Sequence, residues 1–278
     1  MLRQRVVTAL VMAGLFLCAI MFLPLLALAL LFGCVVALGA WEWSRLAGWQ
    51  SALARGVYVL LVIVLMACLF VFCGLDVGPA RADAQPVLGL ACLWWSFAVL
   101  WVRGYPGSAI LWRSMFMRSF MGLLILVSGW FAAVYLLSFP RGGMLMVAMV
   151  LVVAAADIGA YFSGQRFGRH KLAPLVSPAK TWEGFWGGML ACTGLALMFW
   201  YVLPDRVDHI GLASVLAVTL VTALASVVGD LTVSMVKREC GAKDSGTLLP
   251  GHGGILDRLD SLCSAAPVFA LGLLLAGW

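Results

Sequence analysis

Residues 119–163 read SFMGLLILVSGWFAAVYLLSFPRGGMLMVAMVLVVAAADIGAYFS. Two apolar runs, 119–139 and 142–163, meet at Pro140-Arg141, and Arg141 and Asp157 are the only charged residues in the stretch. A run of about 17–25 apolar residues is long enough to cross a bilayer as a helix. The short connection therefore predicts two antiparallel transmembrane helices.

The same pattern extends along the whole chain. Hydrophobic residues make up 64% of its 278 residues and charged residues 11%, whereas a soluble domain is about 45–50% apolar and about 25% charged. This composition excludes a soluble globule, a disordered chain and a nucleic-acid-binding arm. The eight cysteines form no CxxC pair, which argues against a zinc site or a secreted disulfide scaffold. Apolar runs predict nine spans, at residues 6–23, 25–41, 56–75, 86–102, 119–139, 142–163, 184–203, 209–229 and 262–278.

We therefore expect an all-α, polytopic integral membrane protein with residues 1–278 in a single domain. Residues 1–140 are mainly apolar, and residues 141–278 hold nearly all the candidate chemistry. The first run resembles a signal peptide because Arg3 and Arg5 precede it. It is longer than a usual signal-peptide core of about 7–15 residues, and a second run follows at once after Pro24. We interpret these two runs as the first two spans, joined in a tight antiparallel pair.

The basic residues predict which way the spans face. With a cytoplasmic N-terminus, 15 of the 18 Lys and Arg residues fall on the inner side, and only Arg81, Arg141 and Arg206 fall outside. Positive charge accumulates on the cytoplasmic side of membrane proteins, so this split predicts that orientation. Tryptophans near the predicted span ends are typical of an interfacial belt: Trp41, Trp43, Trp94, Trp95, Trp101 and Trp112.

The predicted inner segment 230–261 reads DLTVSMVKRECGAKDSGTLLPGHGGILDRLDS. Asp230, Ser234 and Lys237 are spaced by four and three residues, so on a helix they share one face, which Ser226 continues upstream. Polar and charged side chains leading out of a membrane span are costly unless they line a wet site. A solvated cytoplasmic loop is the plainer alternative.

Two further features of this segment point to phosphate and metal binding. The turn at residues 249–254 is rich in glycine, which lets backbone N–H groups approach a phosphate closely. Asp257 and Asp260 follow three residues apart, and together with Asp230 they supply the oxygen ligands that Mg²⁺ prefers. Carboxylates opposite Lys and Arg are the arrangement that holds a metal–polyphosphate complex.

The whole pattern has the form S-x-x-K-R-x4-K-D-S-G-x2-L-P-G-H-G-G-x2-D-R-x-D, from Ser234 to Asp260. It closely resembles the signature of the phosphatidate cytidylyltransferases, also called CDP-diacylglycerol synthases. Two other segments are similar to the same family: Asp157-x-Gly159-Ala160-Tyr161-Phe162, and Ser177-Pro178-x-Lys180-Thr181-x-Glu183-Gly184. The hydrophobic plan of the whole chain resembles the family as well.

The resemblance implies an enzyme of phospholipid biosynthesis in the bacterial inner membrane, with its site facing the cytoplasm. It implies that CTP and phosphatidic acid give CDP-diacylglycerol and pyrophosphate, with Mg²⁺ as cofactor and a second metal ion left open. It also implies a homodimer that contacts membrane lipids and no nucleic acid. The residues themselves point only to a polyphosphate and metal site at the inner face.

The roles expected of the site residues follow from this combination. Asp230, Asp257 and Asp260 are the expected metal ligands, and together with Lys237 they form the expected catalytic set. Expected to bind substrate phosphates are Ser177, Lys180, Ser234, Arg238, Lys243, His252, Gly253 and Gly254. His252 is expected to shape the phosphate-binding turn, because a phosphate monoester is already mostly dianionic at neutral pH and needs no general base.

A second inner segment, 164–183, carries a basic cluster of Arg166, Arg169, His170, Lys171 and Lys180, and its stretch Ser177-Pro178-Ala179-Lys180-Thr181 is the part best suited to bind phosphate. Such a cluster is commonly an orientation signal or a contact to anionic lipids; the alternative is that Lys180, held by a Ser-Pro turn, binds a substrate phosphate. Asp157 lies near the inner end of the sixth predicted span, where an acidic side chain is a functional candidate or a structural hydrogen-bonding group.

Three rival functions account for less of the sequence. A transporter or channel would account for Asp157 and Asp230 but not for the dense motif beyond the span. A CDP-alcohol phosphatidyltransferase would need a D-G-x2-A-R…G-x3-D-x3-D run, which the sequence lacks. A CTP-dependent lipid kinase is the closest competitor, and its products, CDP and a phospholipid, would distinguish it.

The predicted orientation can be tested with reporter fusions. A reporter fused after Pro140 should lie outside the cell membrane, and one fused after Gly241 should lie in the cytoplasm, because the positive charges flank the inner ends of the spans. Fluorescence of a cytoplasmic reporter and activity of a periplasmic reporter measure the two sides. The nine-span arrangement fails if both fusions report the same side.

Overall fold

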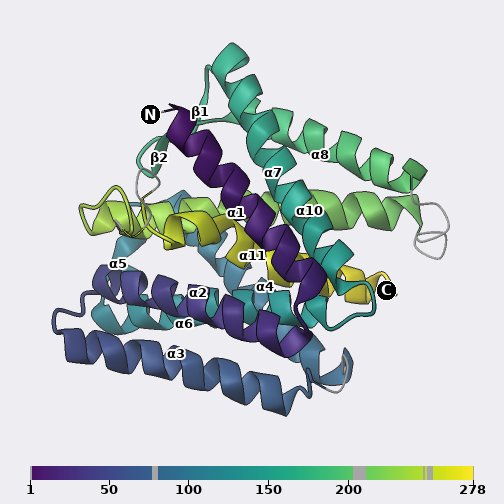
Figure 1. Cartoon of the computed structure of the whole chain (residues 1–278). Helices are drawn as coiled ribbons and strands as arrows, with labels where there is room; N and C mark the ends of the chain where they lie inside the picture. The colour runs from purple at the N-terminus through teal and green to yellow at the C-terminus, as the bar shows by residue number, and fades with distance from the viewer. Residues whose placement is uncertain (1, 77–80, 203–210, 247, 249–252, 278) are drawn as a thin grey trace.

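The computed structural model describes the chain except residues 1, 77–80, 203–210, 247, 249–252 and 278. It is almost entirely helical (Figure 1). The helices and strands are α1 (Leu2–Phe22), α2 (Leu25–Ala47), α3 (Ala52–Phe72), α4 (Arg81–Gly104), α5 (Ala109–Trp112), α6 (Met115–Leu137), α7 (Gly142–Phe167), β1 (Lys171–Ala173), β2 (Ser177–Thr181), α8 (Trp182–Val202), α10 (Leu212–Glu239) and α11 (Leu256–Leu275).

This architecture confirms a polytopic, all-α membrane protein. Every predicted span overlaps a helix, and among the described residues eight helices are long and apolar enough to cross a membrane. The ninth, α1, contributes a shorter apolar stretch, Val11–Phe22. The start of α1 and the end of α11 lie at opposite ends of the bundle (Figure 1).

The last two membrane helices differ from their predicted limits. Helix α10 continues ten residues beyond the predicted end at 229, to Glu239, and α11 begins at Leu256 rather than at 262. Polar residues on one face do not end a helix whose other faces remain buried, as Leu231, Val233 and Met235 are here. The connection between the two helices therefore spans only residues 240–255.

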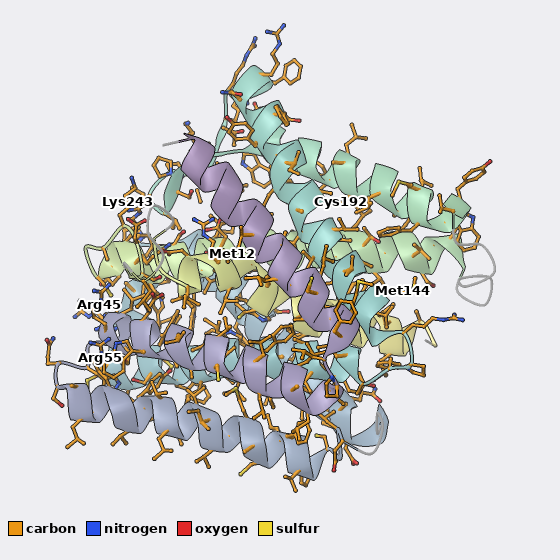
Figure 2. All side chains as sticks on the ribbon, viewed as in Figure 1. Met12, Arg45, Arg55, Met144, Cys192 and Lys243 are labelled. Carbon is orange, nitrogen blue, oxygen red and sulfur yellow. The ribbon has the colours of Figure 1, made fainter. Side chains whose placement is uncertain are left out.

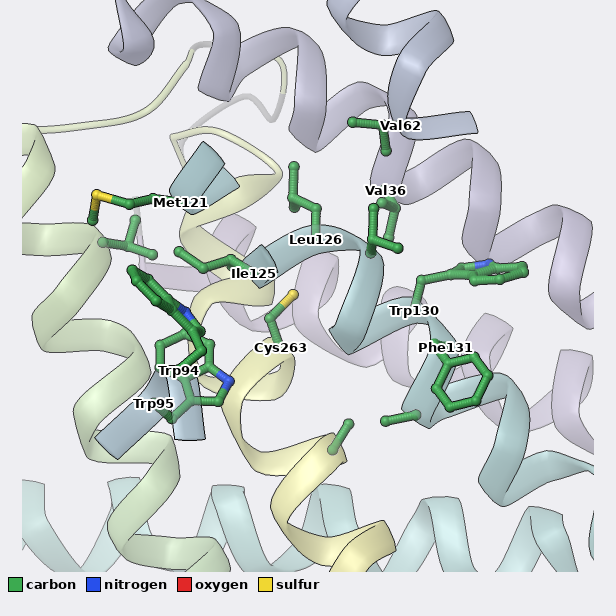
Figure 3. Packing of buried hydrophobic residues seen from close by; sticks show 14 of the residues in the cluster. Val36, Val62, Trp94, Trp95, Met121, Ile125, Leu126, Trp130, Phe131 and Cys263 are labelled. Carbon is green, nitrogen blue, oxygen red and sulfur yellow. The ribbon is translucent and has the colours of Figure 1, made fainter. Parts of the chain in front are cut away.

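Helix α6 forms the centre of the bundle. It packs against α2, α3, α4 and α11, and it is the most buried of the candidate spans. Figure 3 shows Ile125 and Leu126 of α6 in this core together with Cys263 of α11. Trp43, Trp94, Trp95 and Trp112 are also buried here, so the interfacial-belt interpretation is wrong for these four tryptophans.

The predicted tight pairing of the first two spans is wrong. Helix α1 leaves the turn at Pro24 at an angle and packs mainly against α7, while α2 lies along α6 and α3 (Figure 1). A stacked pair, Phe16 and Phe32 with centroids 6.3 Å apart, links α1 to α2. Helices α6 and α7 do contact each other, but the most extensive partner of α7 is α8.

Small residues bring α7 and α8 together. A Cβ atom added at Gly188 would lie 2.7 Å from the carbonyl oxygen of Ala156, and one at Gly159 would lie 2.7 Å from the Cβ of Ala191. Backbones can approach this closely only where side chains are small, which is the usual basis of tight helix packing in membranes. This contact fixes the C-terminal half of α7 beside the N-terminal half of α8.

A short antiparallel hairpin links α7 to α8 and is an addition to the predicted all-helical plan. Lys171 pairs with Thr181, and Ala173 pairs with Ser177. The predicted Ser-Pro turn is therefore wrong, because Ser177 and Pro178 lie in strand β2. The hairpin lies at the end of the bundle that carries Arg45, Arg55 and Lys243, whereas Met144 lies at the other end (Figures 1 and 2).

The contact between α7 and α8 predicts a position-dependent effect on stability. We expect Gly188→Leu to lower the free energy of unfolding by about 1–3 kcal/mol or more, because the new side chain has no space against Ala156. Gly194→Leu on the same helix is the matched control, since nothing lies within 4 Å of a Cβ there. Thermal unfolding of the purified protein in detergent measures both; equal melting temperatures would contradict the packing argument.

Candidate active site

The polar face of α10 is the base of the candidate site. The Ser234 hydroxyl donates to Oδ1 of Asp230 at 3.0 Å, so the predicted common face of these residues is confirmed. The other carboxylate oxygen, Oδ2, lies 2.7 Å from Nζ of Lys180. Lys180 comes from β2, so the hairpin closes over α10 and joins the two segments that the sequence analysis singled out.

A second ion pair joins α10 to α11. Nζ of Lys237 donates to Oδ1 of Asp257 at 2.7 Å, and each side chain is only 10% exposed. Oδ2 of Asp257 accepts backbone N–H bonds from Ser245 and Gly254, each at 3.0 Å. Asp257 thus lies in the first turn of α11 with both oxygens held, where a negative charge also favours the helix N-terminus.

Two more carboxylates lie in the same electrostatic environment. Asp260 is 7% exposed and lies within interaction range of Asp230, Lys237 and Asp257. Asp157 of α7 interacts with Lys180 and Asp230. The structure therefore assembles four acidic and two basic side chains from α7, β2, α10 and α11 at one end of the bundle.

The remaining predicted residues lie around this cluster. Nε of Arg238 donates to the carbonyl of Val176 in the hairpin at 3.1 Å, and Ser177 begins β2. Lys243 is exposed on the connecting loop. Gly253 has a φ of +81°, and a Cβ atom there would lie 2.8 Å from Oδ2 of Asp257, so glycine is required by both backbone and space. His252 lies outside the described residues.

The sequence analysis missed one acidic residue of this end of the bundle. Glu42, near the end of α2, is 3% exposed, and it accepts hydrogen bonds from Ser245, Ile255 and Leu256. A lone ionisable residue beside an apolar run is a signal that could have singled it out. Its partners are more than 200 positions away in the sequence, so no local pattern indicates them.

The donor set suits a hard cation that arrives with a phosphate ligand. Among the described residues, no three acidic, histidine or cysteine side chains converge into a ready-made metal site. Mg²⁺ is commonly held by one or two carboxylates together with substrate phosphates and water, so a complete protein cage is not required. Asp230 and Asp260 provide such carboxylates, and Asp257 lies beside them.

In this cluster lysines are paired with aspartates, and both kinds of charge could take new partners when a substrate binds. Lys180 and Lys237 occupy carboxylate oxygens here, yet lysine is a flexible point charge that binds phosphate equally well. A polyphosphate with a divalent cation would offer phosphate to the lysines and the cation to the aspartates. The chemistry that suits this site is therefore phosphoryl or nucleotidyl transfer.

Comparison with known proteins agrees with this geometry. The chain matches the cytidylyltransferase family over residues 3–276. It is 46% identical to a phosphatidate cytidylyltransferase of Pseudomonas aeruginosa, over 100% of this chain and 99% of that protein. It is 38% identical to a phosphatidate cytidylyltransferase of Haemophilus influenzae, over 97% of this chain and 98% of the relative. A relative of the same name in Brucella suis is 36% identical over 82% of this chain and 73% of its own length.

The two ion pairs should differ in their contribution to stability. Lys237→Met leaves the carboxylate of Asp257 without its cation in a pair that is 10% exposed on each side, and breaking a buried pair costs about 3–5 kcal/mol. In the Lys180–Asp230 pair the side chains are 25% and 31% exposed, so solvent screens this pair more and Lys180→Met should cost less than Lys237→Met. Melting temperatures of the two variants without substrate decide this, and the reverse order would contradict it.

Proposed function

This chain belongs to the cytidylyltransferase family, and we propose that it is a phosphatidate cytidylyltransferase, which transfers CMP from CTP to phosphatidate. The observation that carries the proposal is the meeting of two distant segments, 177–184 and 230–260, through the Lys180–Asp230 pair. The Lys237–Asp257 pair closes the second segment on itself beside this contact. These are the segments whose sequence resembles the family. The full-length relatives named phosphatidate cytidylyltransferase support the same assignment.

The proposed reaction joins two anions. A phosphate oxygen of phosphatidate attacks the α-phosphorus of CTP, the bond from that phosphorus to the β-phosphate oxygen breaks, and pyrophosphate leaves. The attacking group has a second pKa of about 6 and is largely ionised at neutral pH. No side chain has to remove a proton from it, so the task of the protein is to orient the phosphates and to offset their repulsion.

The described side chains are suited to this task. We propose that Lys180, Lys237, Arg238 and Lys243 bind phosphate groups, with Ser177 and Ser234 as hydroxyl donors and the turn at His252, Gly253 and Gly254 as backbone donor. Asp230, Asp257 and Asp260 would hold Mg²⁺, which when bound neutralises charge on the phosphates and the leaving group. Whether one or two metal ions take part is left to metal titration.

The location of the site suits a substrate in the membrane. An apolar cavity of about 210 Å³ lies beside the same part of α11 and is lined by Leu259, Leu262 and Cys263 together with residues of α1, α2, α6 and α7. An acyl chain could occupy it while the lipid phosphate reaches the charged cluster at the helix ends. We propose a cytoplasmic-facing site in a bacterial inner membrane, where CTP arrives from the cytosol, and a homodimer as the working assembly.

The product of the reaction tests the proposal. Purified protein given phosphatidate, CTP labelled at the α-phosphate and Mg²⁺ should form labelled CDP-diacylglycerol and release pyrophosphate. Formation of CDP and a phosphorylated lipid would instead indicate a CTP-dependent lipid kinase. Transport of ions into proteoliposomes without either product would indicate a transporter.

Loss of a proposed metal ligand should reduce turnover and change the Mg²⁺ dependence. We expect Asp257→Asn to lower turnover by about a hundredfold or more and to raise the Mg²⁺ concentration at half-maximal rate. Glu239→Gln is the matched control. Glu239 lies at the end of α10, two residues after the Lys237 that pairs with Asp257, and its described contact is the hydroxyl of Tyr105 at 3.4 Å. Wild-type turnover and Mg²⁺ response in Asp257→Asn would remove this residue from the proposed site.

A further inference from the structure

Glu42 is an ionisable residue buried near the end of a membrane helix. Its side chain belongs to α2, which is otherwise apolar up to this turn, and it is 3% exposed. A buried carboxylate is costly unless hydrogen bonds or charges compensate it. The groups that donate hydrogen bonds to Glu42 therefore indicate its structural role.

All three described hydrogen bonds to Glu42 come from the segment that leads into α11. Oε2 accepts from the Ser245 hydroxyl at 2.8 Å and from the Leu256 N–H at 2.9 Å, and Oε1 accepts from the Ile255 N–H at 3.1 Å. Ile255 is the N-cap residue of α11 and offers no side-chain cap of its own. Glu42 thus supplies, from another helix, the acceptor and the negative charge that a helix N-terminus favours.

Two motif glycines leave the space that this carboxylate occupies. A Cβ atom added at Gly246 or at Gly254 would lie 2.7 Å from Cδ of Glu42. Real Cβ atoms do not approach another atom that closely. The absence of side chains at these positions therefore serves the packing of Glu42, in addition to any contact with a substrate.

The same segment holds the carboxylate of Asp257. The N–H groups of Ser245 and Gly254 donate to Oδ2 of Asp257, while Glu42 holds the Ser245 hydroxyl and packs against Gly254. Arg45, one turn after Glu42, donates to the Ser245 carbonyl. Ser245 is thereby held through its hydroxyl, its carbonyl and its N–H at once.

The end of α2 is a rigid support for these contacts. Gly48 ends the helix in the left-handed conformation with a φ of 109°. Arg55 donates to the Trp41 carbonyl at 2.8 Å, and Arg118 donates to the Leu46 carbonyl at 2.8 Å. Cations and a glycine cap satisfy the last carbonyls of a helix and fix its end, so Glu42 and Arg45 project from a well-anchored turn.

We propose that Glu42 is a positioning residue for the reaction: it orients Asp257 by holding Ser245 and the first N–H groups of α11. It acts through other residues and contacts no reacting atom. The inference rests on the proposed function for its kinetic readout only. Its structural content, the anchoring of Ser245, Ile255 and Leu256 by α2, is independent of which reaction the site performs.

The variant Glu42→Gln tests this because it preserves shape and removes charge. The amide has one oxygen where three donors converge, so its NH₂ group must face an N–H or a hydroxyl. We expect turnover to fall about 10–100-fold and the Mg²⁺ concentration at half-maximal rate to rise, as when a residue behind a metal ligand is lost. The KM for phosphatidate should stay within about twofold, because no contact to that substrate changes.

Hydrogen exchange, which does not depend on enzyme activity, tests whether Glu42 holds the start of α11 in place. Hydrogen exchange of the amides in residues 253–258 should be at least about tenfold faster in Glu42→Gln, since the N–H group of either Ile255 or Leu256 loses its acceptor to the glutamine NH₂ group. Exchange in α7 and α8 should be unchanged. Glu239→Gln, the matched control at the same end of the bundle, should alter neither exchange at 253–258 nor the Mg²⁺ response.

Ser245→Ala provides a second test should Glu42→Gln fail to fold. It removes the hydroxyl donor to Glu42 but keeps the N–H donor to Asp257, so a smaller loss of turnover and a smaller rise in the Mg²⁺ midpoint are expected. Combined with Glu42→Gln, it should add little, because both act on one hydrogen-bond network.

The outcomes are distinguishable. Wild-type exchange, turnover and Mg²⁺ response in a folded Glu42→Gln protein, or in Ser245→Ala where the first variant does not fold, overturn the role of Glu42. A wild-type protein that forms no CDP-diacylglycerol overturns the proposed function instead, and the exchange experiment still decides whether Glu42 anchors the segment. Additive effects of the two substitutions would show that they act separately and would also overturn the inference.

Discussion

The pair formed by Lys237 and Asp257 is the interaction on which the candidate site depends. Its atoms lie 2.7 Å apart with each side chain 10% exposed, so neither charge can be left alone without a large desolvation cost. The pair fixes the end of α10 against the start of α11. Because Asp257 also accepts two N–H bonds from the connecting loop, the loop conformation is tied to the same pair.

Close helix approach makes the rest of the cluster possible. Gly229 of α10 faces Ser264 and the carbonyl of Asp260 in α11 without room for a Cβ atom, and glycines bring α8 equally close to α7. In a bilayer, apolar side chains gain little by leaving lipid for protein, so packing of small residues decides which helices meet. Here that packing brings Asp157 within range of Asp230 and Lys180, and Asp260 within range of Asp230 and Lys237.

The sequence predicts the features that depend on local patterns. Hydropathy locates α1 and the eight long apolar helices among the described residues, because a span is a property of about 20 consecutive residues. Spacing along one helix likewise relates Asp230 to Ser234. The features that could not be predicted depend on distant partners: the pairing of Lys180 with Asp230, the crossing of α1 over α7, and the contact of Glu42 with Ser245, Ile255 and Leu256. The hairpin was missed because strands of three and five residues leave no periodic signal.

The apolar N-terminal half of the chain contributes to the candidate site, although the sequence pattern places the charged motif in the C-terminal half. Residues 141–278 carry the charged motif, but the segment that holds Asp257 is itself held from α2, near the start of the chain. Backbone N–H groups can bind phosphate productively only where they are fixed before the substrate arrives. The carboxylate of Glu42 and the guanidinium of Arg45 fix Ser245 and the first turn of α11. The apolar N-terminal half is therefore part of the site's architecture, because α2 supplies the surface against which these residues are held.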